Sequence, residues 1–564
     1  MINKINSILD KKEKIKLTII SLGGLISSIF EIIGIGTAGP ILLGILNPKI
    51  LADKINQFDQ LSFLNAFEIS NLILMLFLIF FVSFTFKSLF SFYISTKIIK
   101  TGVMIQKKLR SNFIYNYTHL KYEKITSIKS SDIFHYVGHI TRTFCQNVVV
   151  KIFMLISDSI IFFAIITLMM FTNLKLFLLI FTILILSYLF YFFFIRSKIE
   201  IYGRLFGKSD QSFLDISKSI INGFKTIKIL QIDKKFIDIF EKNNTNSSIS
   251  EYNYSKILLL PKVILEISFI FIVAAIFSLS LFLDGDLSND RVALLGIFAI
   301  ASARSIPLIY NIFNSIGNIM GSKYTIEKIY NEIKNIKDVE KPNISQKINF
   351  DFQLLNFKNV CFNYKNNEKI LNNINLEIKK NNFIAVVGPS GSGKTTLIDL
   401  VCGFLHPVSG EIFINNTKNI KSIIPSWRGK IAYIPQENFI FNGSILENIT
   451  FKKDLKEVDT DRFDQIIEQT KVKEFLIKKN KDFNFEINED GKNLSGGQAQ
   501  RISIARALYF KRELLIFDES LNSLNEDLQV DIIQECKNIK RDLTLILITH
   551  NKSILKHFDK VIEL

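Results

Sequence analysis

Six long apolar stretches stand out from a more polar background in the first 325 residues. They lie at about 17–46, 70–94, 148–171, 174–195, 263–283 and 292–313. Each is long enough to cross a bilayer as a helix, which takes about 20 apolar residues. The first follows a basic start and lacks the short apolar core and cleavage site of a signal peptide, so we expect it to be retained. The pattern predicts an all-α transmembrane domain of six helices over 1–325.

The charge of the connecting segments alternates along the chain. Loops 95–147 and 196–262 are rich in lysine, whereas the segment after the fifth span carries mainly aspartate. Basic loops face the cytoplasm, so we expect the amino terminus and both long loops to lie there. Their composition is helical, and we expect them to extend the membrane helices into the cytosol. A short helix with Leu51, Ile55 and Phe58 on its apolar side is expected on the outer membrane surface.

After about Lys323 the sequence becomes charged and polar, and we expect a linker over 326–351. From residue 352 onward, short β-rich runs alternate with helical patterns, which indicates an α/β domain over 352–564 with a mainly parallel sheet. The clearest runs are Phe383–Val387, Leu514–Phe517 and Leu543–Ile548. The chain is therefore predicted to be a multidomain membrane protein with a separate α/β domain.

Composition agrees with a chain that is partly in the membrane and partly in water. Hydrophobic residues make up 48% of the 564 positions and mean hydropathy is +0.27, yet 21% of the residues are charged. The net charge of +17 could indicate nucleic-acid binding. Because much of the excess lies in the cytoplasmic loops, as membrane topology requires, no nucleic-acid partner is expected.

Cysteine and histidine spacing offers little sign of a transition-metal site. The cysteines are Cys145, Cys361, Cys402 and Cys536, with no CxxC pair among them, so we expect reduced, buried thiols. His135 and His139 are four residues apart and could share one helix face, as zinc ligands do. No third ligand accompanies them, so zinc binding is not expected.

A phosphate-binding loop follows the predicted strand Ile384–Val387 and precedes a helix expected to begin at Leu397. Glycines in such a loop let backbone N–H groups converge on phosphate oxygens. Lys394 is expected to reach the β- and γ-phosphates, and the Thr395 hydroxyl to ligate Mg²⁺. The loop reads Gly388, Pro389, Ser390, Gly391, Ser392, Gly393, Lys394, Thr395 and Thr396.

Two carboxylates and a histidine follow other strands of the same predicted sheet. Asp518 and Glu519 end the apolar run that begins at Leu514, and His550 follows the run that ends at Thr549. Asp518 is expected to hold Mg²⁺ directly or through water, and Glu519 to act as general base toward the attacking water. His550 is placed to reach the γ-phosphate.

A second anion-binding turn precedes a helix expected over Arg501–Leu508. It reads Leu494, Ser495, Gly496, Gly497 and Gln498. With this pentapeptide the chain resembles the ATP-binding cassette (ABC) superfamily, in which the turn contacts the γ-phosphate of ATP held by the opposite subunit. Six spans followed by one cassette is the layout of a half-size ABC exporter, so the resemblance covers the whole chain and implies ATP hydrolysis coupled to transport.

The resemblance also implies roles for further residues. Tyr364 would stack on adenine, Gln436 would link Mg²⁺ to the membrane domain, and Glu489-Asp490-Gly491 would make the contact that precedes the signature turn. Two positions depart from the family: Asn525 replaces the usual Asp and Ala499 the usual basic residue. Asn525 keeps an amide oxygen but loses the charge, so coupling between the two ATP sites is expected to differ.

One cassette supplies one phosphate-binding loop and one signature turn on opposite faces. Closing an ATP site therefore requires a second copy, and we expect a homodimer, with a heterodimer of related chains left open. The resemblance further implies the inner membrane of a bacterium, with the ATP-binding domain in the cytoplasm.

Three basic residues fall within or at the ends of the predicted spans, namely Lys87, Lys262 and Arg304. A charge at this depth is costly unless it faces a polar cavity. Lys87 and Lys262 could instead reach the headgroups with their long side chains, and Glu31 could neutralise Arg304. The alternative is a cationic cavity that takes a lipid with an anionic headgroup.

The order Pro261, Lys262, Glu266, Arg304 and Pro307 is similar to that in bacterial lipid-linked oligosaccharide flippases used in protein glycosylation. This narrower resemblance implies a polyprenyl-pyrophosphate-linked glycan as cargo. Two alternatives remain: an exporter of another lipid, a drug or a peptide, and an ATP-gated channel or regulator that moves no cargo.

Overall fold

The computed structural model describes residues 1–564 except 50, 53–67, 285–288, 337–349, 365–368, 479, 489–490, 522–523 and 539–542. Of the predicted outer surface helix, Ile55 and Phe58 lie outside the described residues. The chain divides into two compact units. We call Met1–Leu120 with Ser127–Val339 the membrane unit, and Lys121–Thr126 with Glu340–Leu564 the α/β unit.

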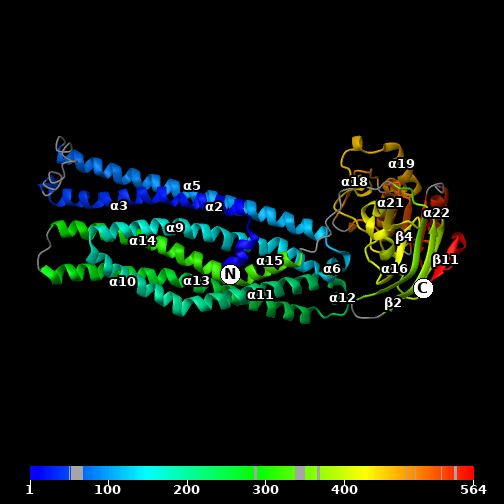
Figure 1. Cartoon of the computed structure of the whole chain (residues 1–564), viewed down its shortest axis with the longest axis horizontal. Coiled ribbons are helices and arrows are strands. Elements are labelled where there is room, and N and C mark those ends of the chain that lie inside the picture. Colours follow the sequence, from blue (N-terminus) through cyan, green and yellow to red (C-terminus); the bar gives the residue numbers. More distant parts are fainter. Residues whose placement is uncertain are drawn as a thin grey trace. The chain divides into compact units, whose positions relative to one another are not determined.

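The membrane unit is built from long helices that run lengthwise side by side (Figure 1). Helix α3 packs against α5, α9 and α14, while α13 packs against α10, α11 and α14. These helices are α2 (Lys11–Leu22), α3 (Gly24–Leu46), α5 (Ile69–Thr118), α9 (Lys151–Thr172), α10 (Leu174–Phe190), α11 (Arg196–Asn222), α13 (Asp233–Asp284) and α14 (Asn289–Gly321).

The described residues contain six helical stretches long and apolar enough to cross a membrane, which confirms the predicted number of spans. They are Lys11–Leu46, Ile69–Thr118, Ser130–Thr172, Leu174–Asn222, Asp233–Ala275 and Leu294–Gly321. Several continue well beyond the apolar runs, so the long loops are helical as expected. Many large apolar side chains point outward, among them Phe81, Phe92 and Phe171. An apolar outer surface of this kind marks contact with a membrane or with another protein.

Shorter elements connect these helices along the chain, including the π-helical segments η2, η3 and η4; one of them, α6, belongs almost entirely to the α/β unit. The apolar centre of the unit forms where α3, α5, α9, α10, α13 and α14 meet, with Ile35, Ile165 and Phe298 fully buried. The short elements are α1 (Ile2–Ile8), α6 (Tyr122–Ser127), α7 (Ser130–His135), η2 (Tyr136–Ile140), α8 (Thr141–Thr143), η3 (Phe144–Val150), η4 (Tyr191–Ile195), α12 (Phe224–Ile229) and α15 (Lys323–Asn335).

The α/β unit contains a five-stranded parallel sheet, which agrees with the predicted mainly parallel sheet. Its strand order, which was not predicted, is β11-β3-β10-β9-β6. A four-stranded antiparallel sheet, β2-β1-β4-β5, and a small pair, β7-β8, were not predicted. The strands are β1 (Leu354–Asn363), β2 (Lys369–Lys379), β3 (Phe383–Val387), β4 (Ser409–Ile414), β5 (Lys418–Asn419), β6 (Ile431–Ile434), β7 (Gly443–Ser444), β8 (Glu486–Ile487), β9 (Leu514–Asp518), β10 (Thr544–Ile548) and β11 (Lys560–Glu563).

The parallel strands are apolar on both faces because each face is covered. Successive side chains of a strand point to opposite faces. Ile384, Ile516 and Ile546 pack toward the antiparallel sheet and helix α16, whereas Phe517 and Leu547 pack toward α21 and α22. This two-sided burial explains why the strands read as unbroken apolar runs in the sequence.

Helices of the α/β unit cover the sheets and form a smaller subdomain around α21. Helix α21 packs there against α18, α19 and α20. The helices are α16 (Lys394–Val401), η5 (Ile420–Ser422), α17 (Ile424–Arg428), α18 (Ile445–Thr450), η6 (Leu455–Glu457), α19 (Thr460–Gln469), α20 (Val472–Lys478), α21 (Gly496–Tyr509), α22 (Glu526–Asn538) and η8 (Leu555–His557).

Candidate functional site

The predicted catalytic residues follow neighbouring strands of the parallel sheet. Strand β10 pairs with β3 on one side and with β9 on the other, and Ile548 is in register with both Val386 and Asp518. Strand β6 pairs with the far side of β9. The segments after β3, β10, β9 and β6 therefore emerge at one edge of the sheet, which is where ligands of open α/β sheets bind.

The loop from Gly388 to Gly393 leaves β3 and turns into α16. Gly391 and Gly393 adopt φ values of +85° and +96°, a left-handed conformation that L side chains rarely adopt. Helix α16 begins at Lys394, three residues before the predicted start at Leu397. The Lys394 ammonium donates to the carbonyl oxygens of Gly388 and Pro389, at 3.0 and 2.9 Å. The loop and its lysine thus form one preorganised anion-binding turn at a helix N-terminus.

Asp518 ends β9 and is almost completely buried. Its Oδ2 accepts a hydrogen bond from the Tyr433 hydroxyl at 2.9 Å. Burial raises the pKa of Asp518, and the charge of Glu519 adds to the effect, while the bond from Tyr433 and the charge of Lys394 oppose it. Tyr433 comes from β6 and was not singled out from the sequence, because the residue that faces Asp518 depends on the strand order.

Glu519 is held by two of the other predicted residues. Its Oε1 lies 3.1 Å from the His550 Nε2, and its Oε2 accepts from the Gln436 side-chain amide at 3.0 Å. Glu519 has φ +50°, which is unusual for a residue other than glycine and marks local strain of the kind found at active sites. The structure therefore brings Glu519, His550 and Gln436 together, although the bond between Gln436 and Glu519 was not predicted.

Thr395, Gln436 and Asp518 offer the oxygen donors that Mg²⁺ prefers. Asp518 uses Oδ2 in its bond with Tyr433, and Gln436 uses its Nε2 toward Glu519. Oδ1 of Asp518 and Oε1 of Gln436 take no part in these two bonds. The chemistry of this donor set fits Mg²⁺.

Tyr364 follows β1 and is exposed. Its ring stands edge-on to that of Phe362, with the centroids 5.0 Å apart and an interplanar angle of 90°. This contact supports the ring from the side and leaves it accessible for stacking, as its predicted role requires.

The signature turn caps helix α21. The Ser495 hydroxyl accepts from the Gln498 backbone N–H, and the Gln498 side chain accepts from the Ser495 N–H, which forms a capping box. The helix therefore begins at Gly496 rather than at the predicted Arg501. Across the described part of the chain, no hydrogen bond or ion pair joins Leu494–Gln498 to the phosphate-binding loop. Glu489 and Asp490 lie outside the described residues.

Two residues beside the site were missed by sequence reasoning. Asp399 in α16 is buried, which raises its pKa to about 6, and the charge of Asp518 adds to this shift. Tyr122 comes from the loop after the second span, yet residues 121–126 belong to the α/β unit. Its ring centroid lies 5.0 Å from that of Phe404. The sequence carried no signal for this contact, because the two residues lie far apart along the chain.

The three basic residues of the spans have three different surroundings. Lys87 lies 2.9 Å from Glu31, whose side chain is completely buried. Lys262 lies 3.8 Å from Glu266, and both side chains are exposed. The Arg304 guanidinium lies over the ring of Phe84, 4.0 Å from its centroid. Glu31 thus pairs with Lys87 and not with Arg304, which corrects the expectation from the sequence.

An acidic residue of the third span, Asp158 in α9, was also missed. It lies within electrostatic reach of Lys87 and Lys151. A count of charges in the apolar run 148–171 would have found it.

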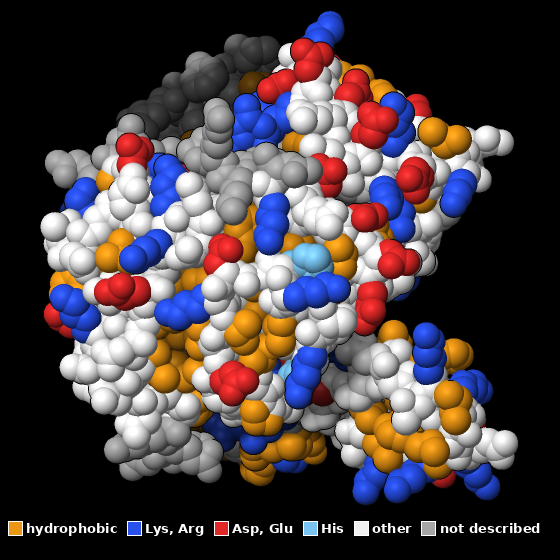
Figure 2. Space-filling view, turned by 90° about the vertical axis from the view of Figure 1, so that its right-hand side faces the viewer, with side chains coloured by type: hydrophobic (Ala, Val, Ile, Leu, Met, Phe, Trp, Pro, Cys, Tyr) orange, Lys and Arg blue, Asp and Glu red, His pale blue; other side chains and the backbone are white. Residues whose placement is uncertain are grey.

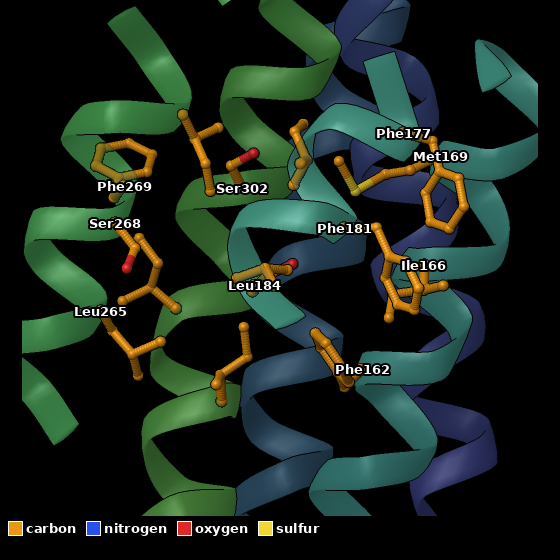
Figure 3. Close-up of a pocket in the computed structure, with 15 residues that line it drawn as sticks. Phe162, Ile166, Met169, Phe177, Phe181, Leu184, Leu265, Ser268, Phe269 and Ser302 are labelled. Carbon is orange, nitrogen blue, oxygen red and sulfur yellow. The ribbon is translucent and has the colours of Figure 1, made fainter. Parts of the chain in front are cut away.

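A cavity of about 20 Å³ lies between α9, α10, α13 and α14 (Figure 3). Figure 3 shows Ser268 and Ser302 among apolar side chains such as Phe162 and Leu184. Ser268 bonds to Ser187 at 2.7 Å, and the buried Ser302 hydroxyl has no partner among the described residues. This volume has room for one water molecule and is far too small for a lipid or a drug.

The two histidines of the third helical stretch stack on each other. His135 and His139 stack with centroids 5.3 Å apart and an interplanar angle of 6°. Within the part of the chain that the structure describes, no group of three or more His, Cys, Asp or Glu side chains is arranged to hold a metal ion.

On the face shown in Figure 2, basic side chains are interspersed with acidic and apolar ones.

Three of the four cysteines are buried and Cys361 is partly exposed; all four are free thiols. The expected reduced state agrees with this arrangement, and the expected burial holds for Cys145, Cys402 and Cys536.

Comparison with known proteins gives matches over both units. Residues 22–304 match the family described as ABC transporter transmembrane region, and residues 371–522 match the family described as ABC transporter. An export ATP-binding/permease protein of Rickettsia typhi is 33% identical over 63% of this chain and 64% of its own length. A similar protein of Rickettsia bellii is 35% identical over 47% of this chain and 44% of its own length.

More distant matches include a leukotoxin translocation ATP-binding protein of Mannheimia glucosida, 38% identical over 36% of this chain and 29% of its own length. The matched segments thus cover less than two thirds of these relatives. A solved structure of a bacterial Atm1-family ABC exporter with ATP bound has a TM-score of 0.73 and 20% identity, covering 94% of this chain and 92% of that one. This likeness supports the six-helix region followed by an α/β domain.

Proposed function

The chain belongs to the ABC transporter family, and on that premise we propose that it is one half of an ATP-driven exporter in a bacterial cell membrane. The observation that carries this proposal is the group formed by Glu519, Gln436 and His550 at the edge of the parallel sheet. It is an intact hydrolytic set beside a phosphate-binding loop.

In this proposal Glu519 accepts the proton of the attacking water, since its carboxylate is held by two neighbours at the site. Lys394 leaves the loop carbonyls to contact the β- and γ-phosphates. His550 contacts the γ-phosphate and helps to position Glu519. Mg²⁺, held by Thr395, Gln436 and Asp518, would neutralise negative charge on the phosphates.

The active form is proposed to be a homodimer. Ser495 and its neighbours make no bond to the phosphate-binding loop among the described residues, so a signature turn from a second copy can complete each ATP site. The membrane unit also presents apolar side chains around α12, with Phe224 and Ile229 exposed by 59% and 80%. Exposed apolar side chains on a cytoplasmic tip favour contact with a second protein chain.

The cargo is proposed to be an amphiphile with an anionic headgroup. Lys87 is already neutralised by Glu31, and Lys262 is exposed and close to Glu266. Arg304 therefore carries most of the argument, because its planar guanidinium can make paired hydrogen bonds to phosphate oxygens. A polyprenyl-pyrophosphate-linked oligosaccharide is the narrower form of this proposal, and it rests on the order of residues from Pro261 to Pro307.

The experiment that tests the cargo is ATP-dependent movement of labelled lipids in proteoliposomes. The panel contains a polyprenyl-pyrophosphate glycan, an anionic phospholipid, a zwitterionic phospholipid and an uncharged lipid. Selective movement of the first supports the narrow proposal, and movement of both anionic lipids supports only the broader one. Steady ATP hydrolysis without movement of any lipid, drug or peptide would favour the channel or regulator alternative.

A further inference from the structure

A groove of about 620 Å³ runs between α2 and α5 in the membrane unit. Its apolar lining includes Ile15, Ile19, Ile20, Phe90 and Ile94, of which Ile94 is buried. Ile15 and Ile19 are 50% and 64% exposed. At the Gly23 end of the groove the two helices are in close contact. A Cβ atom added to Gly23 would lie 3.1 Å from the Ile94 side chain of α5.

Three lysines lie along the same groove: Lys12 and Lys16 on α2, and Lys97 on α5. No carboxylate of the described chain lies within ion-pair distance of any of them; Lys97 lies 5.1 Å from the centroid of the Tyr93 ring. The neighbouring Lys108 on α5 differs, because it pairs with Glu13 on α2 and with Asp10, the residue that caps α2. The groove therefore carries three positive charges that the chain itself does not neutralise.

The position of the lysines along the helices matches the cytoplasmic membrane surface. Lys16 directly precedes the apolar run 17–46, and Lys97 follows the apolar run 70–94. In the assigned topology the first run begins at the cytoplasmic face of the membrane and the second run ends there. The ammonium groups are thus at headgroup level, and the apolar lining extends from them toward the hydrocarbon.

We propose that this groove binds one anionic phospholipid of the cytoplasmic leaflet, with its phosphate among Lys12, Lys16 and Lys97 and an acyl chain along Phe90 and Ile94. A free phosphate would satisfy the lysines but leave the apolar lining in contact with water, whereas a phospholipid satisfies both. The bound lipid is a resident of the groove and not the cargo, so this site stands whether or not the proposed cargo is right.

The test uses Phe90→Trp in the full-length protein, because Phe90 lies in the groove and tryptophan is close to it in size. The single native tryptophan, Trp427, is fully buried in the α/β unit, so brominated acyl chains cannot quench it. Vesicles contain phosphatidylcholine with increasing fractions of brominated phosphatidylglycerol, or of brominated phosphatidylcholine as reference. The ratio of the two quenching curves gives the relative binding constant at the groove.

We expect the groove to prefer phosphatidylglycerol at least about five-fold, which is the effect of one lysine close to an anionic headgroup. Changing Lys12, Lys16 and Lys97 together to Gln should bring the ratio close to one, and changing them to Arg should preserve it. A matched control removes three exposed lysines of the same helices that do not line the groove, Lys11, Lys100 and Lys107, and should keep the preference.

A ratio near one in the Phe90→Trp protein itself would overturn the proposal, as would an equal loss in the control variant. Quenching by neither lipid would also overturn it and would indicate that a second copy of the chain covers the groove. Because the first ratio is measured with all lysines in place, the result does not depend on whether the triple variant folds.

Discussion

The Lys87 ammonium lies 2.9 Å from the Glu31 carboxylate, inside the bundle of membrane helices. The Glu31 side chain is completely buried and that of Lys87 is 15% exposed, so the pair is largely removed from solvent. It joins α3 to α5 and neutralises the lysine within the chain. One turn earlier on α5, the Phe84 ring lies against Arg304, which forms no ion pair with a carboxylate in the part of the chain that the structure describes. The two cations therefore have different roles.

Lys87→Ala should lower the free energy of unfolding by about 3–5 kcal/mol, because it leaves Glu31 buried without a partner of opposite charge. The double variant Lys87→Ala, Glu31→Gln should recover most of this loss. Denaturant unfolding in detergent measures both. Lys262→Ala is the control, and its effect should stay within about 1 kcal/mol because its pair with Glu266 is exposed. If the double variant were as unstable as Lys87→Ala, the ion pair would carry no such energy.

Arg304→Ala should reduce movement of a phosphate-bearing lipid while ATP hydrolysis remains near the wild-type rate. The physical reason is that the guanidinium binds the headgroup, whereas the nucleotide site lies in the other unit. Arg304→Lys should restore part of the transport, since the charge returns without the bidentate geometry. Lys262→Ala should give a smaller defect. Normal transport by Arg304→Ala in the same proteoliposome assay would remove Arg304 from cargo binding.

Mixed dimers test whether the signature turn acts on the opposite subunit. Joining a Lys394→Ala subunit covalently to a Ser495→Arg subunit should leave one composite site free of both changes and place both in the other. Nucleotide occlusion at about one site per dimer is then expected. Dimers that carry the same change in both halves should occlude none. Absence of occlusion in the mixed dimer would contradict the arrangement.

Asp399 gives the α/β unit a specific pH dependence. Its pKa is raised from 3.8 to about 6 in the folded protein, mainly by burial. Between these values the folded state binds more protons than the unfolded state, so this group lowers stability as pH rises through that window and has a constant effect above it. The stability of Asp399→Asn relative to wild type should therefore increase from about pH 4 to about pH 6 and then level off. Trp427 fluorescence during unfolding measures the stability of both proteins. A stability difference between them that does not change with pH would contradict the raised pKa of Asp399.

The sequence predicted the features that depend on local pattern. Apolar runs gave the six spans, and the strand–loop–helix order gave the phosphate-binding loop. Asp518, Glu519 and His550 could be brought together in advance because carboxyl ends of parallel strands meet at one edge of a sheet. The start of α21 at Gly496 was missed because glycine is a poor helix former, although the capping box from Ser495 to Gln498 was readable.

Contacts between distant segments could not be predicted in the same way. Which acid faces Lys87 depends on the rotation of α3 against α5, and neither the spacing nor the residue types of the two helices specify that rotation. Tyr122 and Phe404 are joined only by the tertiary fold. The antiparallel sheet was missed because its strands mix polar and apolar residues, as in Asn372, Asn373 and Asn375 of β2.

Hydrolysis at Glu519 is proposed to drive transport, and one measurement tests this coupling most directly. Wild-type protein and Glu519→Gln are reconstituted separately in proteoliposomes, and ATP hydrolysis and ATP-dependent movement of the anionic lipid are followed in the same samples. The amide keeps the shape of the side chain but cannot accept the proton. Glu519→Gln should still bind ATP, with hydrolysis and lipid movement both reduced by about 100-fold or more. Two results would contradict the account: ATP hydrolysis by Glu519→Gln at the wild-type rate, or undiminished lipid movement by Glu519→Gln although it no longer hydrolyses ATP.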